Sequence, residues 1–116
     1  MVKINPFHEF VINEAFYEIE DISSRAMFGG FGLYKDGIFF AIIADEKLYF
    51  KVDETNKADF ENLGSGPFVY GTLKGKTTTM NYFELPVDII ENREELGKWV
   101  EKSVVVAQNS KKKRKV

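Results

Sequence analysis

Apolar residues form a nearly continuous block between positions 25 and 53, interrupted by two short polar turns. Lys35-Asp36-Gly37 breaks the first apolar run, and Asp45-Glu46-Lys47 breaks the second. An Asp-Gly pair between apolar segments is a strong hairpin signal, because glycine adopts positive φ without steric cost. The pattern therefore predicts three consecutive antiparallel strands, at Arg25–Tyr34, Ile38–Ala44 and Lys47–Val52.

The middle strand, Ile38–Ala44, is apolar at every position. A strand of this kind needs neighbours on both sides, so we place it at the centre of the sheet. The following strand, Lys47–Val52, alternates instead, because its even-numbered residues are apolar. These residues are predicted to face one side of the sheet, with Tyr49 and Lys51 on the other.

Helical periodicity flanks this block on both sides. Apolar residues recur at spacings of three and four within Asn5–Asp21, with Asn5 as the predicted N-cap. A shorter helix is predicted within Asp53–Leu63, before Gly64, and a final helix from Val87 to Gln108. We expect these helices to bury the sheet.

Two further apolar segments, Phe68–Thr72 and Thr77–Leu85, are predicted strands separated by a turn at Lys74-Gly75-Lys76. The element order is therefore α-β-β-β-α-β-β-α. It predicts an α+β fold with an antiparallel five-stranded sheet and helices packed mainly on one face. Residues 1–108 are expected to form one domain, and residues 109–116 a disordered basic tail.

The chain has 116 residues and no cysteine, which excludes disulfides, thiolate metal sites and cysteine nucleophiles. No apolar run approaches the roughly 20 residues that span a bilayer. The first ten residues lack the apolar core of a secretory signal. We expect a cytoplasmic protein without a membrane partner.

The net charge of −2 conceals a division between an acidic body and a basic tail. Five of the 16 basic residues lie at the C-terminus, which leaves 11 basic and 18 acidic residues, a net charge of −7, in residues 1–110. An acidic body repels nucleic-acid phosphates, so nucleic-acid binding is expected to be weak and to depend on the tail. The basic tail residues are Lys111, Lys112, Lys113, Arg114 and Lys115.

The tail allows three interpretations. It resembles a monopartite nuclear import signal, with Ser110 where that signal commonly has proline. Import has meaning only if the protein acts inside a eukaryotic host. A solvated basic segment with weak attraction to nucleic acid, or a tag sequence appended to the protein, fits the same residues.

The glycines are expected to be structural. A dinucleotide-binding fingerprint needs a third glycine and a following helix, whereas Gly30-Phe31-Gly32 leads into a hairpin turn. Glycines inside a strand are typical of a bulge, a bend or a close backbone approach. The predicted structural glycines are Gly29, Gly30, Gly32 and Gly37.

The residues that commonly carry chemistry do not assemble into a recognisable site. His8 is the only histidine, and no nucleophile or second base accompanies it, so we expect a residue on the surface of a helix. Asp36, Asp45 and Asp53 follow no metal-ligand spacing. We therefore expect no enzyme activity, no cofactor and no metal.

The charged residues at the boundaries of the predicted sheet suggest one candidate binding surface. Arg25 and Glu84 lie at predicted strand boundaries, where they either fix strand ends through a charge pair or backbone hydrogen bonds, or bind a ligand. Lys51 and Tyr82 are candidates for the same face of the sheet. The predicted binding surface consists of Arg25, Lys51, Tyr82 and Glu84.

Several motifs together resemble the N-terminal domain of the TfoX/Sxy family over roughly residues 7–107. They are RAMFGGFGLY at residues 25–34, the Asp36-Gly37 turn, PFVY at residues 67–70 and MNYFELP at residues 80–86. The resemblance implies an α-β3-α-β2-α layout, a bacterial origin and a role in transcriptional regulation. Full-length members help to switch on competence genes for DNA uptake, as co-activators with the cyclic-AMP receptor protein. They carry a second, helical domain, and this chain stops where that domain would begin.

Together these observations predict a small non-enzymatic regulatory domain, resembling the N-terminal domain of competence co-activators and acting through protein–protein contacts. Its expected partner belongs to the transcription machinery, and the domain is either a monomer or a homodimer. Two alternatives stay open. One is a weak nucleic-acid binder that uses the basic tail, and the other is an enzyme or small-ligand domain at the glycine-rich strand and the Arg25 and Glu84 edge.

Overall fold

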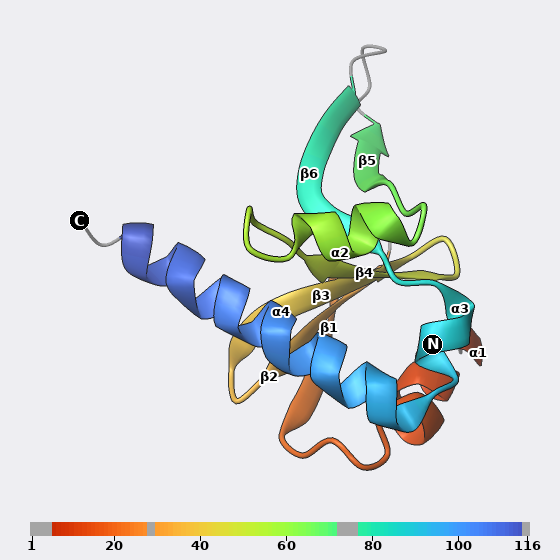
Figure 1. The fold of residues 1–116 in the computed structure, drawn as a ribbon. Helices are drawn as coiled ribbons and strands as arrows, with labels where there is room; N and C mark the ends of the chain where they lie inside the picture. Colours follow the sequence, from red (N-terminus) through yellow and green to blue (C-terminus); the bar gives the residue numbers. More distant parts are fainter. Residues whose placement is uncertain (1–5, 28–29, 72–76, 115–116) are drawn as a thin grey trace.

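The computed structural model describes residues 6–27, 30–71 and 77–114 and confirms an α+β fold with an antiparallel sheet. Its elements are shown in Figure 1. In chain order they are α1 (Pro6–Phe10), the π-helix η1 (Val11–Ala15), β1 (Ile22–Met27), β2 (Gly30–Lys35), β3 (Ile38–Ala44), β4 (Lys47–Lys51), α2 (Lys57–Asn62), β5 (Pro67–Gly71), β6 (Thr77–Glu84), α3 (Val87–Ile90) and α4 (Arg93–Arg114).

The sheet has six strands in the order β1-β2-β3-β4-β6-β5, where five were expected. The additional strand arises because Arg25–Tyr34 is not one strand. It contributes to β1 and β2, which pair antiparallel with Arg25 opposite Gly32 and Met27 opposite Gly30. The reversal falls between Met27 and Gly30, and the predicted structural Gly29 lies outside the described residues. The central position predicted for Ile38–Ala44 is confirmed.

Gly30 and Gly37 have separate structural roles. A Cβ atom on Gly30 would collide with the backbone carbonyl group of Ile43, so this position requires a glycine for close strand approach. Gly37 has φ of 77° and follows Asp36 with φ of 51°, which confirms the predicted Asp-Gly hairpin. Gly32 is buried within β2.

A β-bulge explains how the continuous apolar run of β3 serves both faces of the sheet. Leu33 pairs with Ala41 while the next residue, Tyr34, pairs with Phe39, so Phe40 is the extra residue. Phe40 and Ala41 therefore both join the larger core, whereas Phe39 packs on the opposite side.

Two faces of the sheet follow from this arrangement. The inner face carries the main core, which joins strand residues such as Leu48 and Phe50 to helix residues such as Phe16, Phe60 and Val100. In Figure 1 the long helix α4 runs across this face. The outer face carries a second cluster made of strand residues, namely Ile42, Tyr49, Phe68 and Tyr82. The prediction that helices pack mainly on one face is confirmed, as is the alternation of β4.

The helices differ from their predicted limits at three points. The first helical segment ends with η1 at Ala15, not near Asp21. The last helix is divided, because the side-chain oxygen of Asn92 accepts a hydrogen bond from the backbone N–H of Glu95 at 3.1 Å and caps the start of α4. The predicted short helix is confirmed as α2, with Gly64 at φ of 77° just beyond its end.

The third difference concerns the C-terminus. We expected the final helix to end at Gln108 and the tail to be disordered, but α4 continues to Arg114. Lysine and arginine are good helix formers, and cations interact favourably with the carbonyl end of a helix. The predicted helix end at Gln108 is therefore wrong, whereas the expected disorder of the tail stays a prediction, and Lys115 lies outside the described residues. In the described part of the chain, no helix is both long and apolar enough to cross a membrane.

Candidate binding site on the outer sheet face

The four residues predicted as a binding surface share the outer face. Arg25 lies opposite Gly32, Gly32 opposite Ile42, Ile42 opposite Tyr49, and Tyr49 opposite Glu84. Residues directly opposite each other in antiparallel strands point to the same side, so Arg25 and Glu84 terminate one cross-strand row. Lys51 and Tyr82 pair in the neighbouring row, two residues further along β4 and β6.

Arg25 and Glu84 do not form a charge pair with each other. Four strand spacings separate them, which is about 19 Å at the usual spacing between strands. The Oε1 atom of Glu84 instead lies 4.0 Å from the Nζ atom of Lys47, and both side chains are substantially exposed. A surface ion pair of this kind contributes at most about 1 kcal/mol to stability.

Lys51 packs its charge against an aromatic ring. Its Nζ atom lies 5.0 Å from the centroid of the Tyr82 ring, within the range of a cation–π interaction. The Tyr82 ring also contacts Phe39, whose ring stacks on Tyr34 with centroids 5.2 Å apart. The outer face is thus a small aromatic core, and Lys51 lies at one end of it.

Tyr49 links this aromatic core to the charged edge at Glu84. Its ring lies 4.8 Å from that of Phe68, and its side chain is buried. Burial raises the pKa of the Tyr49 hydroxyl, and the negative charges of Glu84 and Asp45 raise that pKa further. The hydroxyl group is therefore protonated and neutral at physiological pH.

The backbone of Lys51 is held by two buried polar side chains. The carbonyl oxygen of Lys51 accepts hydrogen bonds from the Oγ atom of Ser103 at 2.9 Å and from the Nδ2 atom of Asn56 at 3.1 Å. Ser103 on α4 is fully buried, and Asn56, just before α2, is 2% exposed. Buried polar groups need hydrogen-bond partners, and these two find one in the same carbonyl group.

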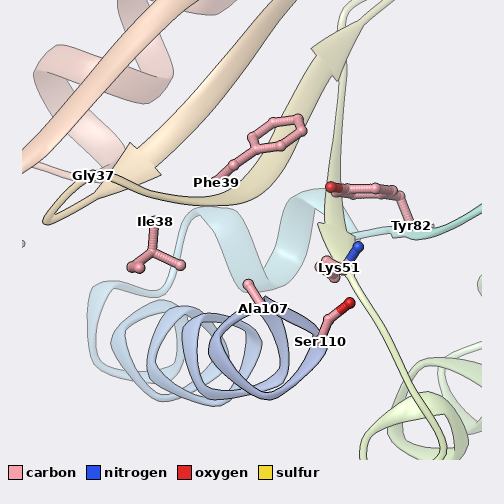
Figure 2. Close-up of a pocket in the computed structure, with 7 residues that line it drawn as sticks. All are labelled: Gly37, Ile38, Phe39, Lys51, Tyr82, Ala107 and Ser110. Carbon is pink, nitrogen blue, oxygen red and sulfur yellow. The ribbon is translucent and has the colours of Figure 1, made fainter. Parts of the chain in front are cut away.

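A pocket of about 280 Å³ opens beside Lys51. In Figure 2, Lys51, Tyr82 and Ser110 lie toward one side of the pocket, and Ile38 lies toward the other. The remaining lining residues are Gly37, Phe39 and Ala107. The pocket therefore joins the start of β3, the end of β4, β6 and the C-terminal part of α4.

A second, wider pocket of about 580 Å³ adjoins the first. Lys51 and Ser110 line both pockets, so these two side chains form the boundary between them. The second pocket is more polar, and its lining includes Asp53, Lys57 and Asn81. Arg25 and Glu84 line neither pocket, so the small-ligand site expected at their edge does not coincide with either depression.

His8 is placed differently from our expectation of a surface residue. It is half-buried, its ring stacks on Phe31 with centroids 3.7 Å apart, and its Nε2 atom lies 2.9 Å from the Oγ atom of Ser24. Burial lowers the pKa of His8, and the charge of Glu9 opposes this change. His8 thus attaches α1 to the β1–β2 hairpin. Within the described residues, no three potential metal-ligating side chains gather in one place.

Three residues at this site, Ser103, Asn56 and Ser110, were not predicted from the sequence. A signal for Ser103 was present, because it interrupts the apolar stripe of the last helix between Val100 and Ala107. A polar residue on such a stripe needs a buried partner. No comparable signal marks Asn56 or Ser110.

Comparison with known proteins agrees with the fold and with the motifs. A curated relative, the DNA transformation protein TfoX1 of Aliivibrio fischeri, is 35% identical over 63 residues. The aligned region covers 54% of this chain but 30% of that protein. The family model of the TfoX N-terminal domain matches residues 14–107, which is most of the chain. This chain therefore belongs to the TfoX N-terminal domain family.

Proposed function

We propose that this chain is a small, non-enzymatic regulatory domain that binds a protein partner through its outer sheet face. The observation that carries the proposal is the cross-strand row from Arg25 to Glu84, with Lys51 and Tyr82 in the adjacent row. Antiparallel pairing gathers these side chains from strands far apart in the sequence onto one face of the sheet, where Tyr82 is buried beneath its neighbours.

The composition of this surface suits a protein interface. Arginine and tyrosine contribute strongly to binding at protein interfaces, particularly around a well-packed centre. Here Arg25 is exposed at the β1 edge, and the half-buried rings of Tyr34 and Phe39 lie on β2 and β3 in the adjacent row. Positive charge at Arg25 and negative charge at Glu84 would fix the orientation of a partner.

The similarity to a DNA transformation protein suggests the process in which the domain acts. The proposal places it in the bacterial cytoplasm, where it contacts a component of the transcription machinery and promotes the expression of DNA-uptake genes. The relative is much longer than the aligned region, so its activity is extended to this chain as part of the proposal.

Gene replacement in the bacterium that carries this chain tests the proposal. Variants Arg25→Glu and Lys51→Glu reverse charges on the outer face, while Lys98→Glu reverses an exposed charge on α4 as the matched control. We expect the outer-face variants to reduce DNA transformation frequency and transcripts of uptake genes, and Lys98→Glu to leave both unchanged. Equal activity of all three variants would exclude the outer face.

A photo-crosslinking amino acid identifies the partner directly. Placed at Tyr34 on the outer face, it should yield a discrete covalent adduct in cells, and mass spectrometry should assign that adduct to a transcription protein. The same amino acid at Glu61, exposed on α2, serves as the control. Adducts that form equally at both positions would contradict a specific interface.

A further inference from the structure

The pocket shown in Figure 2 combines an apolar wall with a polar end. Ile38, Phe39 and Ala107 supply apolar surface, and Lys51, Tyr82 and Ser110 supply an ammonium group and two hydroxyl groups. Small-molecule sites typically have this composition, in which a few polar groups orient an otherwise apolar ligand. Its volume of about 280 Å³ is suited to a small molecule.

The charge of the pocket is opposite to that of the surrounding protein. Residues 1–110 have a net charge of −7, yet Lys51 is the only lining residue with a formal charge at neutral pH. The ammonium group of Lys51 therefore gives this pocket a positive charge that favours an anion.

The backbone of Lys51 is fixed before any ligand arrives. Ser103 and Asn56 donate to its carbonyl oxygen from two different elements, and its ammonium group lies over the Tyr82 ring. A charged residue whose backbone is held by buried hydrogen bonds needs little reordering when it binds. Among the described residues, the buried polar side chains are these two, and both act on Lys51.

We propose that this pocket binds a small organic monocarboxylate, with the carboxylate at Lys51 and Ser110 and the hydrocarbon body against Ile38, Phe39 and Ala107. The ammonium group of Lys51 and the hydroxyl group of Ser110 donate to the carboxylate oxygens. The site shares Lys51 and Tyr82 with the outer face but includes neither Arg25 nor Glu84, and it requires no protein partner.

Nuclear magnetic resonance titration of the purified chain tests this proposal with three probes of nearly equal shape. Phenylacetate has a negatively charged carboxylate, phenylacetamide has a neutral amide in its place, and phenethylamine has a positively charged ammonium group. We expect phenylacetate at millimolar concentration to shift the backbone amide signals of Ile38, Phe39 and Ala107 in a saturable manner. The amide and the amine should bind about tenfold more weakly or not at all.

Substitutions then test whether Lys51 supplies the positive charge that binds phenylacetate. Lys51→Met keeps the aliphatic stem and removes the ammonium group, and it should weaken phenylacetate binding about tenfold. Lys51→Arg restores the charge and should recover most of the affinity. Lys98→Met removes an exposed lysine elsewhere on α4 and should bind as the unmodified protein does.

The comparison of phenylacetate with phenylacetamide uses the unmodified protein, so it decides the question even if Lys51→Met fails to fold. Absence of saturable shifts, equal binding of acid and amide, or full affinity in folded Lys51→Met would each overturn the proposal. The titration contains no partner protein, so its result is independent of whether the outer face binds one.

Discussion

Ser103 donates a hydrogen bond to the carbonyl oxygen of Lys51 at 2.9 Å, although 52 positions separate the two residues in sequence. The same Oγ atom lies 3.3 Å from the carbonyl oxygen of Phe40, the bulged residue of β3. One buried hydroxyl group on α4 thus contacts the backbone at the bulge of β3 and at the end of β4.

Replacing Ser103 with alanine should destabilise the protein by about 1–2 kcal/mol, because the carbonyl groups of Lys51 and Phe40 lose a buried donor. Urea unfolding followed by circular dichroism measures the change. Ser23→Ala, on the exposed side of β1, should alter the free energy of unfolding by less than about 0.5 kcal/mol. Similar effects of both substitutions would mean that the buried hydrogen bonds contribute little.

Gly30→Ala should destabilise the protein by about 2 kcal/mol or more, since the added methyl group collides with the backbone of Ile43. A backbone carbonyl in a central strand has little room to move. The measurement is the thermal midpoint of unfolding, with the retained near-ultraviolet circular dichroism as a check on tertiary packing. An unchanged midpoint would show that β2 and β3 separate easily.

Gly97→Ala should have the opposite effect and stabilise the protein by about 0.5–1 kcal/mol. Gly97 lies inside α4, and a Cβ atom there would meet no other atom within 4 Å. Alanine gains helix propensity at such a position without steric cost. The same thermal assay should show a higher midpoint, and a lower one would reveal a contact that the added methyl group disturbs.

His8 should make stability depend on pH in the mildly acidic range. Its pKa is lowered in the folded state from the ordinary value of 6.5, chiefly by burial, so the unfolded chain binds the proton more readily. The contribution of neutral His8 to the free energy of unfolding is complete above about pH 6.5, and it is lost as the pH falls through the folded-state pKa. Urea midpoints between about pH 7.5 and about pH 5 should therefore decline less in His8→Gln than in the unmodified protein. Parallel curves for the two proteins would contradict this.

Tyr49 should ionise at a higher pH than an ordinary tyrosine. Its pKa is raised above the ordinary value of 10.0, first by burial and then by Glu84 and Asp45, so the folded state keeps the proton longer than the unfolded state does. This contribution to stability is present at neutral pH and is lost as pH rises through the folded-state pKa. Ultraviolet absorbance titration of tyrosinate should lose a component that titrates above the ordinary tyrosine pKa in Tyr49→Phe.

The substitution Glu84→Gln tests the effect of a neighbouring charge on the pKa of Tyr49. It removes one of the two charges that act on Tyr49 and should move the Tyr49 component toward lower pH. Glu61→Gln on α2 is the matched control and should leave the titration unchanged. An unchanged Tyr49 component in Glu84→Gln would leave burial and Asp45 as the causes of the raised pKa.

The sequence was informative wherever local chemistry determines structure. The Asp36-Gly37 turn, the alternation of β4 and the end of α2 at Gly64 all follow from residues within a few positions. The β1–β2 hairpin was missed because no polar residue marks its reversal, and glycines inside an apolar run also fit a bent strand. The pairing of Lys51 with Tyr82 could not be derived, since it depends on the register of strands separated by α2 and β5.

Ala107 belongs at once to the main core and to the lining of the pocket beside Lys51. One wall of that pocket is therefore part of the hydrophobic core and not a surface loop. A molecule lodged there would resist the separation of α4 from the strands beneath it. A bound ligand should consequently raise the thermal midpoint of unfolding. Thermal unfolding in the presence of each member of a metabolite collection can therefore identify the natural ligand without knowledge of its role.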